Sequence, residues 1–278
     1  GYEQQYPGYE QYPGYEQQYA GYEQPAQPYE QPAGALHEHE VGVELREQHV
    51  HDGLHALTAR AQARGLDITS EAYPYTAGST AIGSEFFRDG WQERTGASYA
   101  DLQWPATGER LTKDSFERYR REQPGAAVVI HIIPEEIVDM VIADPALSIA
   151  SDGMPWHTAG EHPRGAGTFS RVLGKYVRER KALDLMTALR KMTIMPARRL
   201  EGISPQMARK GRVAPGMDAD LTLFDPATVI DLATFEKPMQ PSRGIRHVLV
   251  NGQPVVQNGK LVPNVWPGKA VLGTGKGQ

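Results

Sequence analysis

The chain has 278 residues, of which 29 are Lys or Arg and 34 are Asp or Glu, so its formal net charge is −5. The first 34 positions hold five Glu and no basic side chain, and the rest of the chain is therefore balanced. A balanced charge argues against nucleic acid as a partner. The absence of cysteine excludes a disulfide framework and a cysteine-ligated metal site.

No apolar stretch of the sequence approaches the roughly 18 residues that a membrane-spanning helix needs. The first residues also lack the basic-then-apolar pattern of a secretory signal peptide. The sequence therefore predicts a soluble, cytoplasmic protein that does not bind a membrane.

The segment 1–34 repeats variants of GYEQQYP, and it contains no Val, Ile, Leu or Phe. Such a composition cannot bury enough apolar surface to offset the entropy lost on ordering. We expect this segment to be a disordered low-complexity tail. The alternative is that its tyrosines and glutamines make the tail self-associate.

Residues 35–210 are predicted to alternate between helices and strands. Apolar spacing and a terminal glycine indicate a helix over Leu54–Gly65, followed by a strand over Asp67–Ala72 that runs into a proline-bearing turn. A helix over Lys113–Arg121 then precedes the apolar run Ala126–Ile132, which is typical of a buried strand.

The alternation continues beyond this run, with the same order of helix and strand. The pattern predicts a helix over Glu135–Ile142, a short strand over Leu147–Ser151, and helices over Phe169–Arg180 and Leu183–Lys191, the last closed by TIMPAR. Strands and helices in this order favour an α/β fold in which the three strands lie parallel, as in a (β/α) barrel.

Residues 211–278 are predicted to form a small β-domain. Short apolar runs are separated there by Pro-Gly and Asn-Gly pairs. Val248–Val250 and Val255–Val256 flank the pair Asn251-Gly252, which is the strongest short-range signal for a β-hairpin.

Reactive side chains of parallel α/β folds gather where strands end and loops begin. Three positions fit this rule: the turn after the first strand, the end of the second, and the loop that follows the third. The side chains concerned are Glu71, Tyr73, Tyr75 and Ser79 in the first, His131 in the second, and Asp152, His157, His162 and Arg164 in the third.

Each of these residues has a functional and a structural interpretation. Asp152 ends an apolar strand, so we expect a half-buried carboxylate that is catalytic or caps a turn. Arg164 can bind a carboxylate through two hydrogen bonds or form a salt bridge within its loop. His162 precedes a proline and either has a role in the site or simply shapes the loop, and His131 is either a ligand or a hydrogen-bonded core imidazole.

Several ordered segments together resemble one known family. They are EAYPYTAGST, ASDG, HPRGAGTFSRVLGKYVRE, LRKMTIMPARRL, KGRVAPGMDADLTLFDP and GIRHVLVNG. In this order they are similar to N-acyl-D-amino-acid deacylases, namely the D-aminoacylases and N-acyl-D-glutamate deacylases of the amidohydrolase superfamily. The resemblance covers roughly residues 53–268 and implies the C-terminal part of a zinc-dependent (β/α) barrel, followed by a β-sandwich-like domain.

The resemblance also implies a reaction and four site residues. The family hydrolyses the amide bond of N-acyl-D-amino acids, with N-acyl-D-glutamate as one substrate that the sequence favours. Asp152 matches the aspartate that moves protons between water and the leaving amine. Arg164 matches the arginine that holds the substrate α-carboxylate, and Tyr73 and Ser79 match further substrate contacts. We expect the four side chains to converge on one cleft.

The chain also departs from the family pattern. The HxH motif of the first barrel strand and the cysteine ligand of this subfamily are missing, and His37, His39, His49 and His51 do not sit in the expected context. Zinc ligands are therefore not assigned, and we expect neither stoichiometric zinc nor deacylase activity from this chain alone. Two alternatives remain, a hydrolase of cyclic amides like dihydroorotase or hydantoinase, and a non-catalytic scaffold with a self-associating tail.

Overall fold

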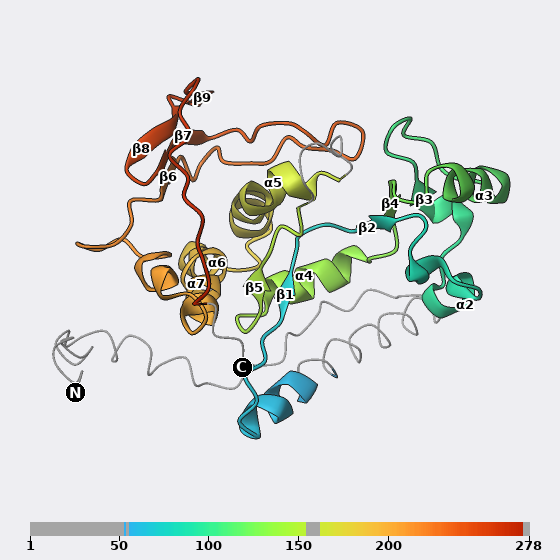
Figure 1. Cartoon of the computed structure of the whole chain (residues 1–278), viewed down its shortest axis with the longest axis horizontal. Helices are drawn as coiled ribbons and strands as arrows, with labels where there is room; N and C mark the ends of the chain where they lie inside the picture. Colours follow the sequence, from blue (N-terminus) through green and yellow to red (C-terminus); the bar gives the residue numbers. More distant parts are fainter. Residues whose placement is uncertain (1–52, 54–55, 154–161, 275–278) are drawn as a thin grey trace, which may run out of the picture. The chain divides into compact units, whose positions relative to one another are not determined.

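The computed structural model describes residues 53, 56–153 and 162–274, and these form a mixed α/β structure (Figure 1). The predicted tail over 1–34, the four N-terminal histidines and His157 lie outside the described residues. Residues 56–63 are helical, and Gly65 follows with a positive φ of 80°, as predicted for a glycine that ends a helix. None of the helices in the described part of the chain is long and apolar enough to cross a membrane.

Two of the predicted strands form a parallel pair. Strand β1 (Glu71–Ala72) lies beside β5 (Ser148–Ile149), with Glu71 opposite Ser148. Both strands are shorter than predicted, but their parallel pairing and their place in the chain are confirmed. Because the two carboxyl ends meet at one edge of the pair, the residues that follow β1 and β5 start close together. The described residues contain no closed barrel.

The second predicted strand, over Ala126–Ile132, does not belong to this parallel pair, so the prediction that all three strands lie parallel was wrong. Strand β4 (Ala127–Ile130) is the middle of an antiparallel sheet in the order β2-β4-β3. Its neighbours are β2 (Gly78–Ala81) and β3 (Leu102–Gln103). A continuous apolar run indicates a strand that is buried on both faces, and the centre of an antiparallel sheet satisfies that condition as well as a barrel does.

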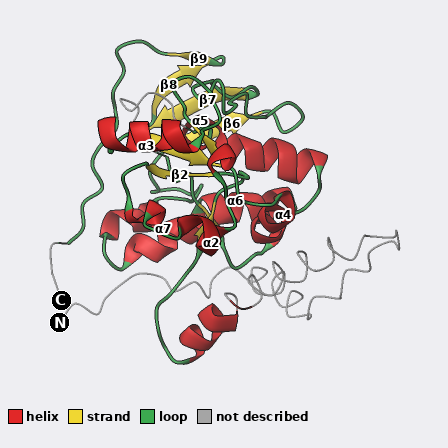
Figure 2. Cartoon of the chain, turned by 90° about the vertical axis from the view of Figure 1, so that its right-hand side faces the viewer, coloured by secondary structure: helices red, strands yellow, loops and turns green. Residues whose placement is uncertain are grey.

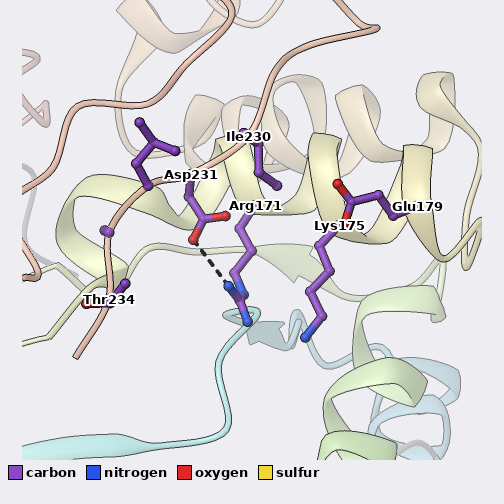
Figure 3. Close-up of a pocket in the computed structure, with 8 residues that line it drawn as sticks. Arg171, Lys175, Glu179, Ile230, Asp231 and Thr234 are labelled. Atoms are coloured by element: carbon purple, nitrogen blue, oxygen red, sulfur yellow. Dashed lines mark hydrogen bonds and ion pairs between the residues drawn. The ribbon is translucent and has the colours of Figure 1, made fainter. Parts of the chain in front are cut away.

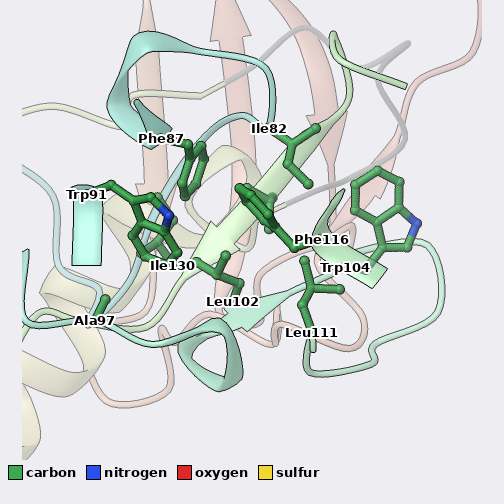
Figure 4. Packing of buried hydrophobic residues seen from close by; sticks show 10 residues of the cluster. Ile82, Phe87, Trp91, Ala97, Leu102, Trp104, Leu111, Phe116 and Ile130 are labelled. Atoms are coloured by element: carbon green, nitrogen blue, oxygen red, sulfur yellow. The ribbon is translucent and has the colours of Figure 1, made fainter. Parts of the chain in front are cut away.

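The antiparallel sheet has an apolar core of its own, built from residues between Ile82 and Ile132 (Figure 4). Phe87, Trp91 and Phe116 pack edge to face or stacked at its centre. The helices that contribute to it are η2 (Glu85–Phe87), α2 (Trp91–Thr95), η3 (Tyr99–Asp101) and α3 (Lys113–Glu122). A capping box between Thr112 and Ser115 begins α3 at its predicted position.

A second apolar core includes Ile149 of β5 and residues of α4 (Glu135–Ala143), the π-helix η4 (Val172–Glu179) and α6 (Leu185–Met192). The other helices of this part of the chain are α5 (Arg164–Arg171), α7 (Ile194–Glu201) and the 3-10 helix η5 (Pro205–Arg209). Helices are drawn in red in Figure 2. The predicted α4 and α6 are confirmed within two residues.

Two helix boundaries differ from the sequence prediction. The helix predicted to begin at Phe169 begins at Arg164, because Pro163 can occupy the position before the first turn, where no backbone N–H is needed. The TIMPAR segment closes α6 as predicted, because Thr193 is the C-cap of that helix. The segment also begins α7, which was not predicted, and Pro196 sits in the first turn of α7, where proline is tolerated.

The C-terminal residues form a four-stranded antiparallel sheet. Its strands are β6 (Leu221–Phe224), β7 (Ile245–Val250), β8 (Gln253–Gln257) and β9 (Lys260–Leu261), in sequence order. Asn251 and Gly252 both have positive φ, 48° and 76°, which confirms the predicted hairpin. The long connection between β6 and β7 leaves the sheet and passes over α5 (Figure 1).

A buried lysine fixes the end of α4. Lys191 on α6 is fully buried, and its Nζ donates hydrogen bonds to the carbonyl oxygens of Ile142 and Asp144. These carbonyls lie at the C-terminal end of α4, where no intrahelical donor is available. Burial lowers the pKa of Lys191 to about 8, so the ammonium is charged at neutral pH and complements the helix dipole.

We predict that Lys191→Met lowers the free energy of unfolding by roughly 1–3 kcal/mol, because it keeps the length of the side chain but leaves buried carbonyls without a donor. Urea denaturation measures the change. Lys113→Met is the matched control, because the Lys113 side chain is 68% exposed and pairs with Glu117 on the same helix. Equal stability of the two variants would contradict the capping role.

Candidate functional site

Arg164 lies at the centre of the four residues that the sequence singled out. Its Nη1 is 2.9 Å from Oδ2 of Asp152, and its Nη2 is 3.5 Å from the carbonyl oxygen of Ser79. The guanidinium carbon lies 5.1 Å from the centre of the Tyr73 ring. The structure thus brings all four predicted residues together around one buried cation.

The fold explains this convergence. Tyr73 follows β1 directly, and Asp152 follows the parallel strand β5, so both start from the same edge. Ser79 lies on β2, and Arg164 is the first residue of α5. Asp152 has a φ of 47°, a left-handed conformation that Asp tolerates better than most residues and that recurs at functional sites.

Asp152 differs in one respect from its prediction. Its side chain is 58% exposed, whereas Arg164 is only 3% exposed. The expected half-buried carboxylate is therefore more open, because it points from the end of the strand and only one of its oxygens meets the buried guanidinium. A carboxylate in this position is accessible to water and to a small substrate.

Two buried polar atoms of this cluster have no hydrogen-bond partner among the described residues. They are Nε of Arg164 and Oγ of Ser79. A buried donor without an acceptor costs about 1–3 kcal/mol. Nε shares one edge of the guanidinium with Nη2, whose contact to Ser79 is long, while Asp152 occupies Nη1. This edge, which we call the open edge because its Nε has no partner among the described residues although it is buried, has the paired donors that a carboxylate accepts.

Tyr73 is a neutral hydrogen-bond donor in this cluster. Burial, as the main cause, and the nearby Asp152 raise its pKa, while Arg164 acts in the opposite direction. The phenol therefore keeps its proton at neutral pH. Together with Arg164 and the hydroxyl of Ser79, it presents donors and no negative charge to a ligand.

The other residues of the first turn have structural roles. Glu71 is exposed on β1. Tyr75 is buried, and its hydroxyl lies 3.3 Å from the carbonyl oxygen of Pro163 and 3.4 Å from Oδ2 of Asp231. Burial and the Asp231 carboxylate raise the pKa of Tyr75, so this hydroxyl stays protonated and donates.

His131 does not reach the Arg164 cluster. Its Nε2 is 2.8 Å from Oε1 of Gln103, and its ring meets Phe235 edge to face. Burial above all lowers the pKa of His131 to about 4, so the imidazole is neutral. The core interpretation of this histidine agrees with these contacts.

Sequence reasoning missed a layer of residues behind the site. Arg171 donates from Nε to the carbonyl oxygen of Pro74, at 2.8 Å, and from Nη1 to Oδ2 of Asp231, at 3.2 Å (Figure 3). Asp231 belongs to the connection between β6 and β7, so this ion pair ties the C-terminal part of the chain to the first turn. The sequence could not predict these contacts of Arg171, because positions 74, 171 and 231 are far apart in the chain and share no local pattern.

A cavity of about 450 Å³ lies beside this ion pair (Figure 3). Its charged side chains are already paired, Arg171 with Asp231 and Lys175 with Glu135. It is therefore a poorer site for a charged ligand than the open edge of Arg164. The cavity is lined by Arg171, Lys175, Glu179, Ile230, Asp231, Leu232, Ala233 and Thr234.

The described residues do not provide a metal site. No group of three or more His, Asp or Glu side chains within them could hold an ion, and the chain contains no Cys. A catalytic zinc needs about three protein ligands. The donors around Arg164 do not fit a zinc ion, because Asp152 is the only carboxylate among them and it meets a guanidinium.

Comparison with known proteins gives a consistent family. The profile of the amidohydrolase family matches residues 24–256. The chain is 37% identical over 203 residues to an N-acyl-D-glutamate deacylase of Alcaligenes xylosoxydans xylosoxydans, and 38% identical over 208 residues to a D-aminoacylase of the same organism. These matches cover 69% and 72% of this chain but only 39% and 41% of the two relatives.

A solved structure agrees with the sequence matches. The structure of the N-acyl-D-glutamate deacylase from Bordetella bronchiseptica, in complex with zinc and a phosphonate inhibitor that mimics the tetrahedral intermediate, aligns with a TM-score of 0.61 at 30% identity. The alignment covers 77% of this chain and 45% of that one. The chain therefore spans less than half the length of the relatives it matches.

We predict opposite effects for two glycines of α5. A Cβ added at Gly167 would lie 2.4 Å from the Tyr75 hydroxyl and 2.8 Å from Cβ of Asp231, whereas a Cβ at Gly165 would meet nothing within 4 Å. Gly167→Ala should lower the free energy of unfolding by roughly 1–3 kcal/mol through overpacking. Gly165→Ala should leave it unchanged or raise it by up to roughly 1 kcal/mol, since alanine favours helices. Thermal or urea unfolding measures both, and a stabilising Gly167→Ala would refute the close packing behind the site.

Proposed function

Because this chain belongs to the amidohydrolase family, we propose that its Arg164 cluster binds N-acyl-D-amino acids and takes part in the hydrolysis of their amide bond. N-acyl-D-glutamate is the substrate we favour, since the curated relatives include an N-acyl-D-glutamate deacylase at 37% identity. The chain covers only 39% of that relative. That this chain carries out the whole hydrolysis is therefore proposed as well.

The observation that carries the proposal is the open edge of Arg164. Its buried Nε and the nearby hydroxyl of Ser79 have no partner among the described residues. The α-carboxylate of an amino acid would accept hydrogen bonds from both, and from Nη2 as well. The protonated Tyr73 would supply a further donor beside the guanidinium.

The proposed role of Asp152 follows from the other edge of the same guanidinium. Nη1 of Arg164 holds Asp152 at 2.9 Å. A substrate whose α-carboxylate lies on the open edge has its amide nitrogen only two covalent bonds from that carboxylate carbon. One cation therefore sets the distance between the bound carboxylate and a proton-transfer group.

The proton transfers then balance in two steps. When a water oxygen adds to the amide carbonyl carbon, Asp152 accepts the water proton. When the carbon–nitrogen bond breaks, Asp152 returns that proton to the leaving nitrogen. The products are the carboxylate of the acyl group and the free D-amino acid. No step in this sequence is assigned to a metal, because no group of three or more His, Asp or Glu side chains among the described residues could ligate one.

Two rival functions make different use of the same residues. A hydantoinase-like enzyme acts on rings that carry no carboxylate and would have no need for a carboxylate clamp in the His-Pro-Arg loop, which disfavours that form of the cyclic-amide alternative. A dihydroorotase-like enzyme acts on a ring that carries a carboxylate, so it differs from the proposal in the amide that it cleaves. A non-catalytic scaffold would leave the open edge of Arg164 without a ligand. Binding of an N-acyl-D-amino acid therefore separates the enzyme interpretation from the scaffold.

We predict that the full chain binds N-acetyl-D-glutamate more tightly than N-acetyl-L-glutamate. Arg164→Lys should weaken binding roughly tenfold to hundredfold, because an ammonium cannot reproduce the two parallel hydrogen bonds of the guanidinium edge. Asp152→Asn should bind at least as tightly as the wild type, because it removes a negative charge near the bound carboxylate. Titration calorimetry measures all three.

Turnover of N-acetyl-D-glutamate by the wild type and the Asp152→Asn variant is the second measurement. Release of free D-glutamate is measured with zinc supplied, and any turnover by the wild type should be lost in Asp152→Asn, which keeps binding but cannot transfer the proton. Two results would count against the proposal. One is a wild-type chain that binds neither enantiomer, which supports the scaffold, and the other is an Asp152→Asn variant that keeps full turnover.

A further inference from the structure

His162 makes one hydrogen bond with each nitrogen of its ring. Its Nε2 lies 2.9 Å from the carbonyl oxygen of Ala77, and its Nδ1 lies 3.1 Å from the backbone nitrogen of Arg164. The residue is 5% exposed. The imidazole therefore bridges the loop before Ser79 and the first turn of α5.

The two partners determine the tautomer. A backbone N–H can only donate, so Nδ1 of His162 accepts from Arg164 and carries no proton. A backbone carbonyl can only accept, so Nε2 carries the proton and donates to Ala77. The ring is the neutral Nε2–H tautomer with both nitrogens in use. It is therefore free neither to ligate a metal nor to exchange protons with a substrate.

The bond to Arg164 satisfies a helix terminus. The first N–H groups of a helix have no intrahelical acceptor, and a side chain of the N-cap residue commonly supplies one. The N-cap of α5 is Pro163, whose side chain has no oxygen or nitrogen that could do so. His162, one residue earlier, supplies the acceptor for the N–H of Arg164.

Aromatic contacts hold the ring in this orientation. The rings of Tyr75 and Phe235 meet it edge to face at centroid distances of 5.3 Å and 5.0 Å, and the ring of Tyr73 does so at 6.1 Å. Edge-to-face pairs are favourable and restrict rotation of the rings. Phe235 comes from the connection between β6 and β7, so three distant segments meet on this one imidazole.

The charge state of His162 agrees with the bridge. Burial above all lowers the pKa to about 3, the bond to Ala77 opposes this change, and the positive charge of Arg164 adds to it. The ring therefore stays neutral at ordinary pH. A protonated ring would place an N–H against the N–H of Arg164.

We propose that His162 is a positioning residue that sets the spacing between Ser79 and Arg164 and so shapes the open edge of the guanidinium. Ala77 lies two residues before Ser79, and His162 lies two residues before Arg164, so the imidazole joins the two segments next to the residues that would hold the carboxylate. The link to substrate affinity rests on the proposed function, while the bridge itself does not.

Two substitutions separate the two halves of the bridge. His162→Asn places an amide oxygen where Nδ1 stood and keeps an acceptor for the N–H of Arg164, but it cannot reach Ala77. His162→Gln extends an amide NH₂ towards Ala77 and provides no acceptor near Arg164. If His162 acts through Arg164, the Asn variant keeps more of the function than the Gln variant.

We expect His162→Gln to weaken binding of N-acetyl-D-glutamate about three- to tenfold, the value of one hydrogen bond, and His162→Asn to weaken it less. The NMR signal of the Arg164 Nε–H should be sharp and slow to exchange in the wild type. It should broaden or exchange faster in His162→Gln. Urea unfolding of both variants shows whether they are folded when the signal is read.

His131→Asn is the matched control. His131 is a half-buried imidazole that also packs on Phe235 but makes no contact with Arg164, and the substitution removes its hydrogen bond to Gln103. The Arg164 signal and the affinity should be unchanged in this variant. A change as large as that of His162→Gln would mean that loss of aromatic packing, and not positioning of Arg164, causes the effect.

The wild-type chain alone provides the test that does not depend on any variant folding. Nitrogen NMR of the ring should show the neutral Nε2–H tautomer, with no titration between about pH 5 and pH 8. An Nδ1–H tautomer or an ordinary histidine titration would overturn the proposal. So would a His162→Gln variant with an unchanged Arg164 signal. If the wild type binds no N-acyl-D-amino acid, the proposed function fails, and the tautomer and the Arg164 signal still decide the bridge.

Discussion

The buried guanidinium of Arg164 is the constraint on which the rest of the site depends. It is 3% exposed and stands at the first position of α5, where the helix dipole is positive and disfavours a cation. A buried charge in such a place must be paired or hydrogen-bonded. Asp152 pairs with one edge of the guanidinium, and the other edge has a buried donor without a partner among the described residues. Because this edge of a buried cation lacks an acceptor, a second carboxylate is the ligand that fits it best under the proposed function.

The parts of the chain that surround Arg164 are held by contacts from far away in the sequence. His162 bridges Ala77 and the N–H of Arg164, while Asp231 pairs with Arg171 and meets the hydroxyl of Tyr75. Both arrangements use segments from the first turn, from α5 and from the C-terminal connection. The C-terminal part of the chain therefore contributes to the site by supporting it, even though its own sheet carries none of the four central residues.

The described part of the chain holds less of a barrel than the sequence predicted. The chain spans 39% to 41% of the curated deacylases it resembles, and its described residues contain a single parallel pair where a barrel was predicted. The antiparallel sheet between β1 and β5 has its own core, so it packs as an inserted unit. It nevertheless delivers Ser79 to Arg164, which gives the insertion a place in the proposed binding site.

Local sequence patterns determined much of the secondary structure and, through motif resemblance, the identity of the four central residues. Helices α3 and α4 and the hairpin at Asn251-Gly252 were predictable, since caps, apolar periodicity and turn chemistry act over a few residues. Only the tertiary structure decided which strands flank β4, because an apolar run indicates that a strand is buried but not which strands pair with it. It also decided the tautomer of His162 and the contact of Asp231 with Arg171. Those depend on which backbone groups and side chains meet across 60 to 85 positions of sequence, and no local pattern encodes such a meeting.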